Sequence, residues 1–247
     1  MCSSGVSTKL SQTGYSNYLE IKKFVTYPKK TSPDTLPLFQ SAFAACRTWM
    51  NDYGVDLPEG ITESFSKILG ACEWLDVPPV ADLEDIRFAY TSRTTASMWD
   101  QVLPTIPQNI AAIFGMSAFF DQSRSFVQRL SELKPGKFHI GVQSATVSAP
   151  KELLSLESVD VLDSESILSE TVRSYIHAKL LYLEAHDNPV LISGSANLSY
   201  PAWMANGNSA NAEAVLLHSG SGARESYQSL GFGELDGIGR ASCRERV

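Results

Sequence analysis

Helical and extended patterns of apolar residues alternate along this chain. Apolar residues recur at helical spacing in three long stretches and in the shorter TASMWDQVLPTI, and short apolar runs typical of buried strands lie between and after them. The helical stretches cover 34–55, 61–75, 95–106 and 123–133, and the strand-like runs cover 19–27, 85–92, 109–121, 137–145, 159–163, 175–183, 190–193 and 214–217. This order predicts an α/β domain with a mostly buried mixed sheet flanked by helices.

The stretch YIHAKLLYLEAHDNPVLISGSANLS, residues 175–199, places polar side chains among strand-forming ones. Side chains alternate between the two faces of a strand, so His177 and Lys179 should share one face, and Ser195 and Asn197 should share a face after the next strand. Gly194 permits close approach of two backbones. We therefore predict a hairpin that gathers an imidazole, an ammonium, a hydroxyl and an amide at one end of two strands. Such a set suits a phosphoryl group.

Composition narrows the classes of protein. The chain has 247 residues, 43% of them hydrophobic, and a formal net charge of -7, which does not indicate a nucleic-acid-binding or membrane-surface protein. No apolar run approaches the roughly 20 residues that span a bilayer, and we expect a cytoplasmic protein. The four cysteines are widely spaced, so we expect neither a zinc site nor a disulfide framework, and no cofactor. Cys46 and Cys72 are expected in the core.

Three segments resemble a known family. HAK at His177, followed by Glu184 and then by GSANLS, resembles the HxK…(D/E)…GSxN motif of the phospholipase D superfamily. Downstream, NAEAVLL resembles the family's N-x-E segment and aligns Glu213 with its Glu, and IFGMSAFFD resembles the strand that precedes the motif in bacterial members. The resemblance covers about 110–217 and implies a phospholipase D-like mixed β-sheet flanked by helices.

The resemblance implies a metal-free, two-step phosphodiester transfer through a phosphohistidine. The implied catalytic residues are His177, Lys179, Ser195 and Asn197, with Glu213 orienting the ring of His177. We expect the substrate to be a nucleic-acid phosphodiester, in DNA or RNA. Two other hypotheses remain open. One is hydrolysis or transfer of a lipid head group, and the other is a non-catalytic scaffold with a decayed site.

The family builds its active site from two such motifs, and this chain contains one complete HxK. VSTKLSQTGYSNYLEI, near the start, resembles the stretch GSANLTxxGYxxNxE of a first motif, with Ser7 at its Ser and Glu20 at its Glu; the alternative is a polar segment that leads into a strand. We expect a remnant of a first half and a helical connection in 1–100 and a second half in 101–237. A homodimer or a missing N-terminal half would complete the site. Residues 238–247 back-translate into a string that resembles a sequencing-library adapter, and we expect them not to be biological.

Overall fold

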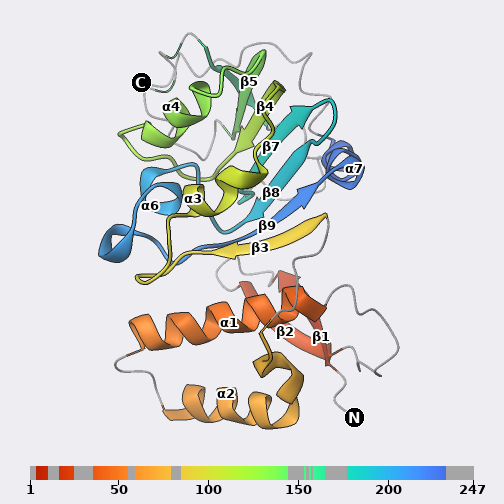
Figure 1. Cartoon of the computed structure of the whole chain (residues 1–247), viewed down its shortest axis with the longest axis vertical. Coiled ribbons are helices and arrows are strands. Elements are labelled where there is room, and N and C mark those ends of the chain that lie inside the picture. The colour runs from red at the N-terminus through yellow and green to blue at the C-terminus, as the bar shows by residue number, and fades with distance from the viewer. Residues whose placement is uncertain are drawn as a thin grey trace. The chain divides into compact units, whose positions relative to one another are not determined.

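The chain divides into two compact units, Met1–Leu83 and Glu84–Val247. The computed structural model (Figure 1) describes residues 4–10, 17–24, 36–54, 59–78, 85–143, 153, 156, 158–164 and 177–231. The expected non-biological tail, 238–247, lies outside the described residues.

The first unit contains a strand pair and helices. Strands β1 (Ser4–Leu10) and β2 (Asn17–Phe24) pair antiparallel, and Ser7 lies opposite Glu20 in their register. Helices α1 (Leu36–Tyr53) and α2 (Glu59–Ala71) form where helical spacing predicted them, and a short 3₁₀ helix, η2 (Glu73–Asp76), follows.

One cysteine prediction is wrong in this unit. Cys72 is buried as expected, but Cys46 is exposed on α1. The buried residues of α1 are Gln40 and Ala45, and Nε2 of Gln40 donates to the carbonyl O of Trp74 at 2.9 Å. Gln40, a polar side chain satisfied by a backbone acceptor, is therefore buried on α1 where Cys46 is not.

The second unit is built on one seven-stranded mixed sheet with the strand order β3-β9-β8-β7-β4-β5-β6. Its strands are β3 (Ile86–Tyr90), β4 (Ile110–Met116), β5 (Lys137–Val142), β6 (Asp160–Asp163), β7 (Leu180–Ala185), β8 (Val190–Gly194) and β9 (Ala214–Ser219). Strands β4, β5 and β6 are parallel, and the other neighbours pair antiparallel. The predicted α/β fold with a mixed sheet is confirmed.

Helices cover both faces of this sheet (Figure 1). Helices α3 (Met98–Val102), α4 (Ser125–Ser131) and α6 (Tyr200–Trp203) pack on one face in the larger core cluster, where Phe126 stacks on Trp203 at 4.5 Å. Helix α7 (Ser221–Ser229) packs on the other face, where Tyr182 stacks on Tyr227 at 3.9 Å. Short 3₁₀ helices, η3 (Leu103–Thr105) and η5 (Gly207–Ser209), lie in the connections. None of the helices in the described part of the chain has the length and apolar character needed to cross a membrane.

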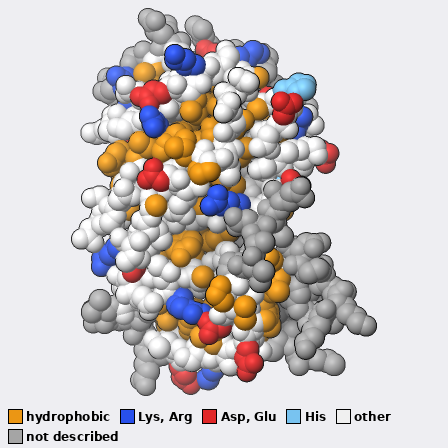
Figure 2. All heavy atoms as spheres, in the orientation of Figure 1, with side chains coloured by type: hydrophobic (Ala, Val, Ile, Leu, Met, Phe, Trp, Pro, Cys, Tyr) orange, Lys and Arg blue, Asp and Glu red, His pale blue; other side chains and the backbone are white. Residues whose placement is uncertain are grey.

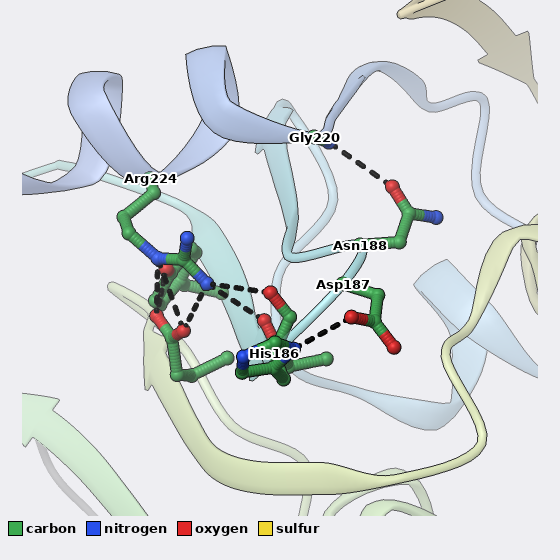
Figure 3. Close-up of polar contacts among 8 residues, drawn as sticks. His186, Asp187, Asn188, Gly220 and Arg224 are labelled. Carbon is green, nitrogen blue, oxygen red and sulfur yellow. Dashed lines mark hydrogen bonds and ion pairs between the residues drawn. The ribbon is translucent and has the colours of Figure 1, made fainter.

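The turn between β7 and β8 is tied to α7 (Figure 3). Nη2 of Arg224 donates to Oε1 of Glu184 at 2.6 Å, and the amide N of Gly220 donates to Oδ1 of Asn188 at 3.1 Å. The side chain of His186, in the same turn, is almost fully exposed. These contacts hold the turn end of the β7–β8 hairpin against α7. The predicted site residues lie at the opposite end of the sheet.

Candidate active site

Polar residues collect at one end of the seven-stranded sheet. There β3, β4, β5, β6 and β8 end, whereas β7 and β9 begin, because β4 to β6 are parallel and the remaining pairs alternate in direction. Buried polar side chains lie just beyond these strand ends: Thr91, Ser92, Ser117, Gln143, Ser164, Ser199 and Glu213. Since buried polar groups normally serve hydrogen bonds, this end of the sheet is built for polar chemistry.

His177 and Lys179 lie at this end, immediately before β7 rather than within it. The sequence predicted an extended strand through both residues, but the strand begins at Leu180. Leu180 is the first residue of β7 that pairs with the neighbouring strands, with Met116 of β4 on one side and Ser193 of β8 on the other. One further hydrogen bond joins the amide N of Gly194 to the carbonyl O of Lys179 at 3.3 Å. The segment is therefore anchored at one side while its side chains extend past the sheet.

The imidazole of His177 and the ammonium of Lys179 are in direct contact. Nζ of Lys179 lies 3.0 Å from Nδ1 and 3.1 Å from Nε2 of His177. Partial burial lowers the pKa of His177, and the positive charge of Lys179 lowers it further. Partial burial also lowers the pKa of Lys179, and the negative charge of Glu213 opposes that change. The free site therefore favours a neutral imidazole beside a cation.

Glu213 lies directly before β9 and is only 6% exposed. Oγ of Ser195 donates to its Oε2, and Nδ2 of Asn211 donates to its Oε1 at 3.1 Å. The same Oγ of Ser195 accepts from the amide N of Ala214 at 3.0 Å. Ser195 therefore holds the carboxylate and joins β8 to β9. The hydrogen bond from His177 to Glu213 that the resemblance implies stays a prediction.

Gly194 allows the backbones of β8 and β9 to lie close together, as the absence of a Cβ at this residue predicts. A Cβ at this residue would collide with the carbonyl O of Ala214 and lie 2.8 Å from Cα of Val215. Both are backbone atoms, which cannot swing aside as a flexible side chain can. The close approach allows Ser195, the next residue, to bond to Ala214 and Glu213 together.

Asn197 is joined to the loop that follows β4. Its Oδ1 lies 3.2 Å from Oγ of Ser117, and the same Oγ accepts from the amide N of Leu198 at 3.0 Å. Two residues after Ser117, the ring of Phe119 makes an edge-on contact with the ring of His177, with centroids 6.0 Å apart. Since an amide oxygen only accepts, the Nδ2 amide of Asn197 is the group that can donate to a phosphate oxygen.

The acidic residue of the motif, Glu184, lies elsewhere. It shares a face of β7 with Tyr182, which packs in the smaller core cluster with α7. Partial burial raises the pKa of Glu184, but hydrogen bonds from Arg224 and Tyr182 outweigh this effect and hold the pKa below its usual range. The contacts make Glu184 part of the attachment of α7 to the sheet.

At this end of the sheet the described contacts join the predicted residues of the complete motif in two pairs, His177 with Lys179 and Ser195 with Glu213, and join Asn197 to Ser117. Ser7 and Glu20, the residues predicted from a first motif, lie in the other unit, opposite each other on β1 and β2. Within the described residues, no group of three or more His, Cys, Asp or Glu side chains is arranged to share a metal ion.

The sequence predicted no functional role for Thr91, Ser117 or Phe119. Oγ1 of Thr91 accepts from the amide N of Glu213 at 3.1 Å, and the amide N of Thr91 donates to the carbonyl O of Glu213 at 2.8 Å. The signal that could have found Thr91 is a polar residue directly after a buried strand. Ser117 and Phe119 lie within IFGMSAFFD, the segment that resembles the strand before the motif. Their contacts with Asn197 and His177 could not be read from that resemblance.

No protein-family model and no curated protein sequence match the chain. Among solved structures, the chain is similar to NucT from Helicobacter pylori, with 15% identity, 59% of this chain and 94% of that chain covered, and a TM-score of 0.42. It is similar to the yeast tyrosyl-DNA phosphodiesterase, with 13% identity, 74% of this chain covered and a TM-score of 0.48, and it spans 54% of that protein's chain. Nuc from Salmonella typhimurium, a phospholipase D family member, is 12% identical, with 63% and 95% of the two chains covered and a TM-score of 0.41. At these levels of similarity, the case for a function rests on the side chains of the site.

Proposed function

We propose that this chain is a phosphodiesterase of the phospholipase D superfamily that acts on nucleic-acid phosphodiesters through a phosphohistidine. The observation that carries the proposal is a pair of contacts at the same end of the sheet: Lys179 contacts His177, and Ser195 holds Glu213. These are the residue types, in the order along the chain, of the superfamily motif. The stretch GSANLSYPAW is similar to the corresponding segment of tyrosyl-DNA phosphodiesterases, which favours a nucleic acid over a lipid.

In the proposed first step, a neutral imidazole nitrogen attacks phosphorus and a P–N bond forms. The P–O bond to the leaving group breaks, and a second imidazole, protonated, gives its proton to the leaving oxygen. In the second step, water attacks phosphorus, the same second imidazole accepts the proton of the water, and the P–N bond breaks to restore the nucleophile. The lowered pKa of His177 suits the attacking role when a second copy supplies the acid. With a separate first-half His as nucleophile, His177 would be the acid.

The cation and the amide of the site would stabilise charge as it develops. The ammonium of Lys179 and Nδ2 of Asn197 can each donate to a non-bridging oxygen of the phosphoryl group. Binding of the phosphate anion would also favour the protonated forms of Lys179 and His177, which offsets the lowered pKa of both groups in the free protein.

We also propose that β1 and β2 are the remnant of a first half. In this strand pair Ser7 lies opposite Glu20. In the complete motif Ser195 directly follows β8 and Glu213 directly precedes β9, and these two strands are antiparallel neighbours. The match in residue type and strand arrangement supports β1 and β2 as a first-half remnant, whereas β3, which also lies within 1–100, pairs with β9 in the sheet of the second unit.

The test is the rate at which the full chain hydrolyses bis(p-nitrophenyl) phosphate and a labelled oligonucleotide. His177→Asn should lower either rate at least about a hundredfold, the lower end of what a positioned proton-transfer group contributes. Acid quenching during turnover of a phosphorus-labelled substrate should trap label on the wild-type protein as acid-labile phosphohistidine and none on the variant.

His186→Asn provides the matched control, because His186 lies in the turn at the far end of β7 with its side chain almost fully exposed. This variant should retain the wild-type rate. Equal rates for wild type and His177→Asn would remove the phosphodiesterase assignment and leave the scaffold hypothesis.

A further inference from the structure

Phe119 is an exposed aromatic ring on a firmly held backbone. It is 58% exposed, more than any other large hydrophobic side chain of the described residues. Its neighbours are anchored, since Ala118 is 3% exposed and Phe120 packs against the larger core cluster. Oγ of Ser117 accepts from the amide N of Phe119 at 3.3 Å and donates to its carbonyl O at 2.7 Å. The loop therefore presents this ring to solvent in a fixed position.

The ring of Phe119 lies beside the proposed reacting group. Its centroid is 6.0 Å from that of the His177 ring, and the two planes meet at 75°. A second exposed aromatic residue, Tyr200, is tied to the same loop, because its amide N donates to Oδ2 of Asp121. A phosphate held at His177 would bring one of its ester substituents next to Phe119.

The chemistry of this position selects a flat, aromatic substituent. A nucleobase offers a π face to an exposed phenyl ring, and in a duplex that face is covered by the neighbouring base pairs. An acyl chain would need a broader apolar surface, whereas the neighbours of Phe119 at the site include the polar residues His177 and Ser117. Figure 2 shows Lys and Arg side chains interspersed with Asp and Glu side chains over the described part of the face drawn. With a net charge of -7, phosphate attraction alone gives weak binding, so stacking has to contribute more.

We propose that Phe119 is the stacking platform for the nucleobase next to the scissile phosphate, so that this site takes single-stranded, unpaired nucleic acid. The inference rests on the proposed function, since it takes the phosphate to be bound at His177. It adds that the nucleic acid is single-stranded at the site and that Phe119 is the residue that selects such a strand.

The test measures binding of the full chain to a fluorescent single-stranded oligonucleotide with phosphorothioate linkages, which resist cleavage, and to its duplex. Phe119→Leu keeps an apolar side chain and loses the π face, so the Kd for the single strand should rise at least about fivefold. Phe119→Trp should bind as tightly as the wild type or more tightly. The duplex should bind more weakly than the single strand, and Phe119→Leu should not change its affinity.

Phe39→Leu is the control for the substitution itself, since Phe39 is an exposed phenylalanine of α1 in the other unit. Equal affinity of wild type and Phe119→Leu for the single strand, equal affinity of the wild type for single strand and duplex, or no binding of the oligonucleotide would each overturn the inference. Tight binding to phosphatidylglycerol vesicles that Phe119→Leu leaves intact would overturn it in favour of a lipid.

The same measurements separate this inference from the proposed function. Phe119-dependent binding of the single strand, without hydrolysis that requires His177, supports the stacking platform and refutes the phosphodiesterase. His177-dependent hydrolysis with binding that is indifferent to Phe119 supports the phosphodiesterase and refutes the stacking platform.

Discussion

At the scale of single residues, the candidate site is organised before any substrate binds. Lys179 contacts His177, Ser195 and Asn211 hold Glu213, and Ser117 contacts Asn197. Groups that are already in place need little rearrangement when charge develops on a phosphoryl group, which is the main advantage of a preorganised polar site.

The titration of His177 tests the contact with Lys179. Because partial burial and the neighbouring ammonium both disfavour the imidazolium, we expect NMR titration to give His177 a pKa below the ordinary value of about 6.5. Lys179→Met removes the repelling charge, so the pKa should rise, while remaining below the ordinary value because burial persists. Lys179→Arg keeps the charge and should leave the pKa low. A pKa that does not respond to Lys179→Met would show that the ammonium does not act on the imidazole.

Thr91 is predicted to position Glu213. Its hydroxyl accepts from the amide N of Glu213 and donates to the carbonyl O of Asn211 at 2.7 Å. Thr91→Val leaves the buried amide N of Glu213 and the carbonyl O of Asn211 without this partner, and should reduce the free energy of unfolding by about 1–3 kcal/mol. Turnover of the phosphodiester should fall as well.

Thr91→Ser keeps the hydroxyl and should restore most of the activity and stability lost in Thr91→Val. Urea denaturation and the rate of hydrolysis measure the two effects. If the Ser and Val variants behave alike, the hydroxyl of Thr91 is not what holds Glu213.

At the scale of elements, the site depends on where strands stop. Strand β7 begins at Leu180, β8 ends at Gly194 and β9 begins at Ala214, all at the same end of the sheet. Beyond the end of a strand, side chains no longer alternate between the two faces of the sheet, while the paired backbone next to them keeps its position. Residues from several strands can therefore converge on one place. The opposite end of the hairpin is held by Arg224 of α7.

Gly194→Ala tests the close approach of β8 and β9. The added Cβ would meet the backbone of Ala214 and Val215, so the strands have to separate, and we expect a loss of about 2 kcal/mol or more in the free energy of unfolding. Gly60→Ala is the matched control, because a Cβ at this residue of α2 would have no heavy atom within 4 Å. It should be neutral or raise stability by up to about 1 kcal/mol. Similar denaturation midpoints for both variants would contradict the proposed crowding.

At the scale of the whole molecule, the number of histidines limits which imidazoles can serve as nucleophile and as acid. The chain has four, all within the described residues. His177 lies at the site, whereas His186 and His218 lie toward the other end of the sheet and His139 lies inside β5. An acid and a nucleophile that are both imidazoles therefore require a second histidine from another copy of the chain or from another polypeptide segment.

We expect a homodimer in which two copies share one site, since closed twofold pairs are the commonest oligomers. Mixing equal amounts of wild type and His177→Asn, with exchange of subunits, should then leave about a quarter of the wild-type activity rather than half, because only wild-type pairs are complete. Mixing with His186→Asn should leave activity unchanged. A remaining activity of half would mean that the second half-site is not another copy of His177.

The sequence by itself determined the strands of the second unit, its helices α3 and α4 and the residues of the motif, whereas α6 and α7 match no predicted helix. Alternation and helical spacing are local properties, so the mixed sheet, the turn before β8 and the need for glycine at 194 could all be predicted. Local spacing was insufficient for Cys46, whose exposure depends on which face of α1 is covered, and for the start of β7, which depends on where its neighbours leave the ladder.

The tertiary structure alone decided which residues support the motif. Ser117 reaches Asn197 across 80 residues of sequence, and Thr91 bonds to Glu213 across 122. No periodicity relates residues so far apart, because their contact follows from the strand order of the sheet. The exposure of Phe119 beside His177 was decided in the same way, since Ala118 is buried and the partly buried Phe120 packs against the larger core cluster, which directs the ring of Phe119 outward.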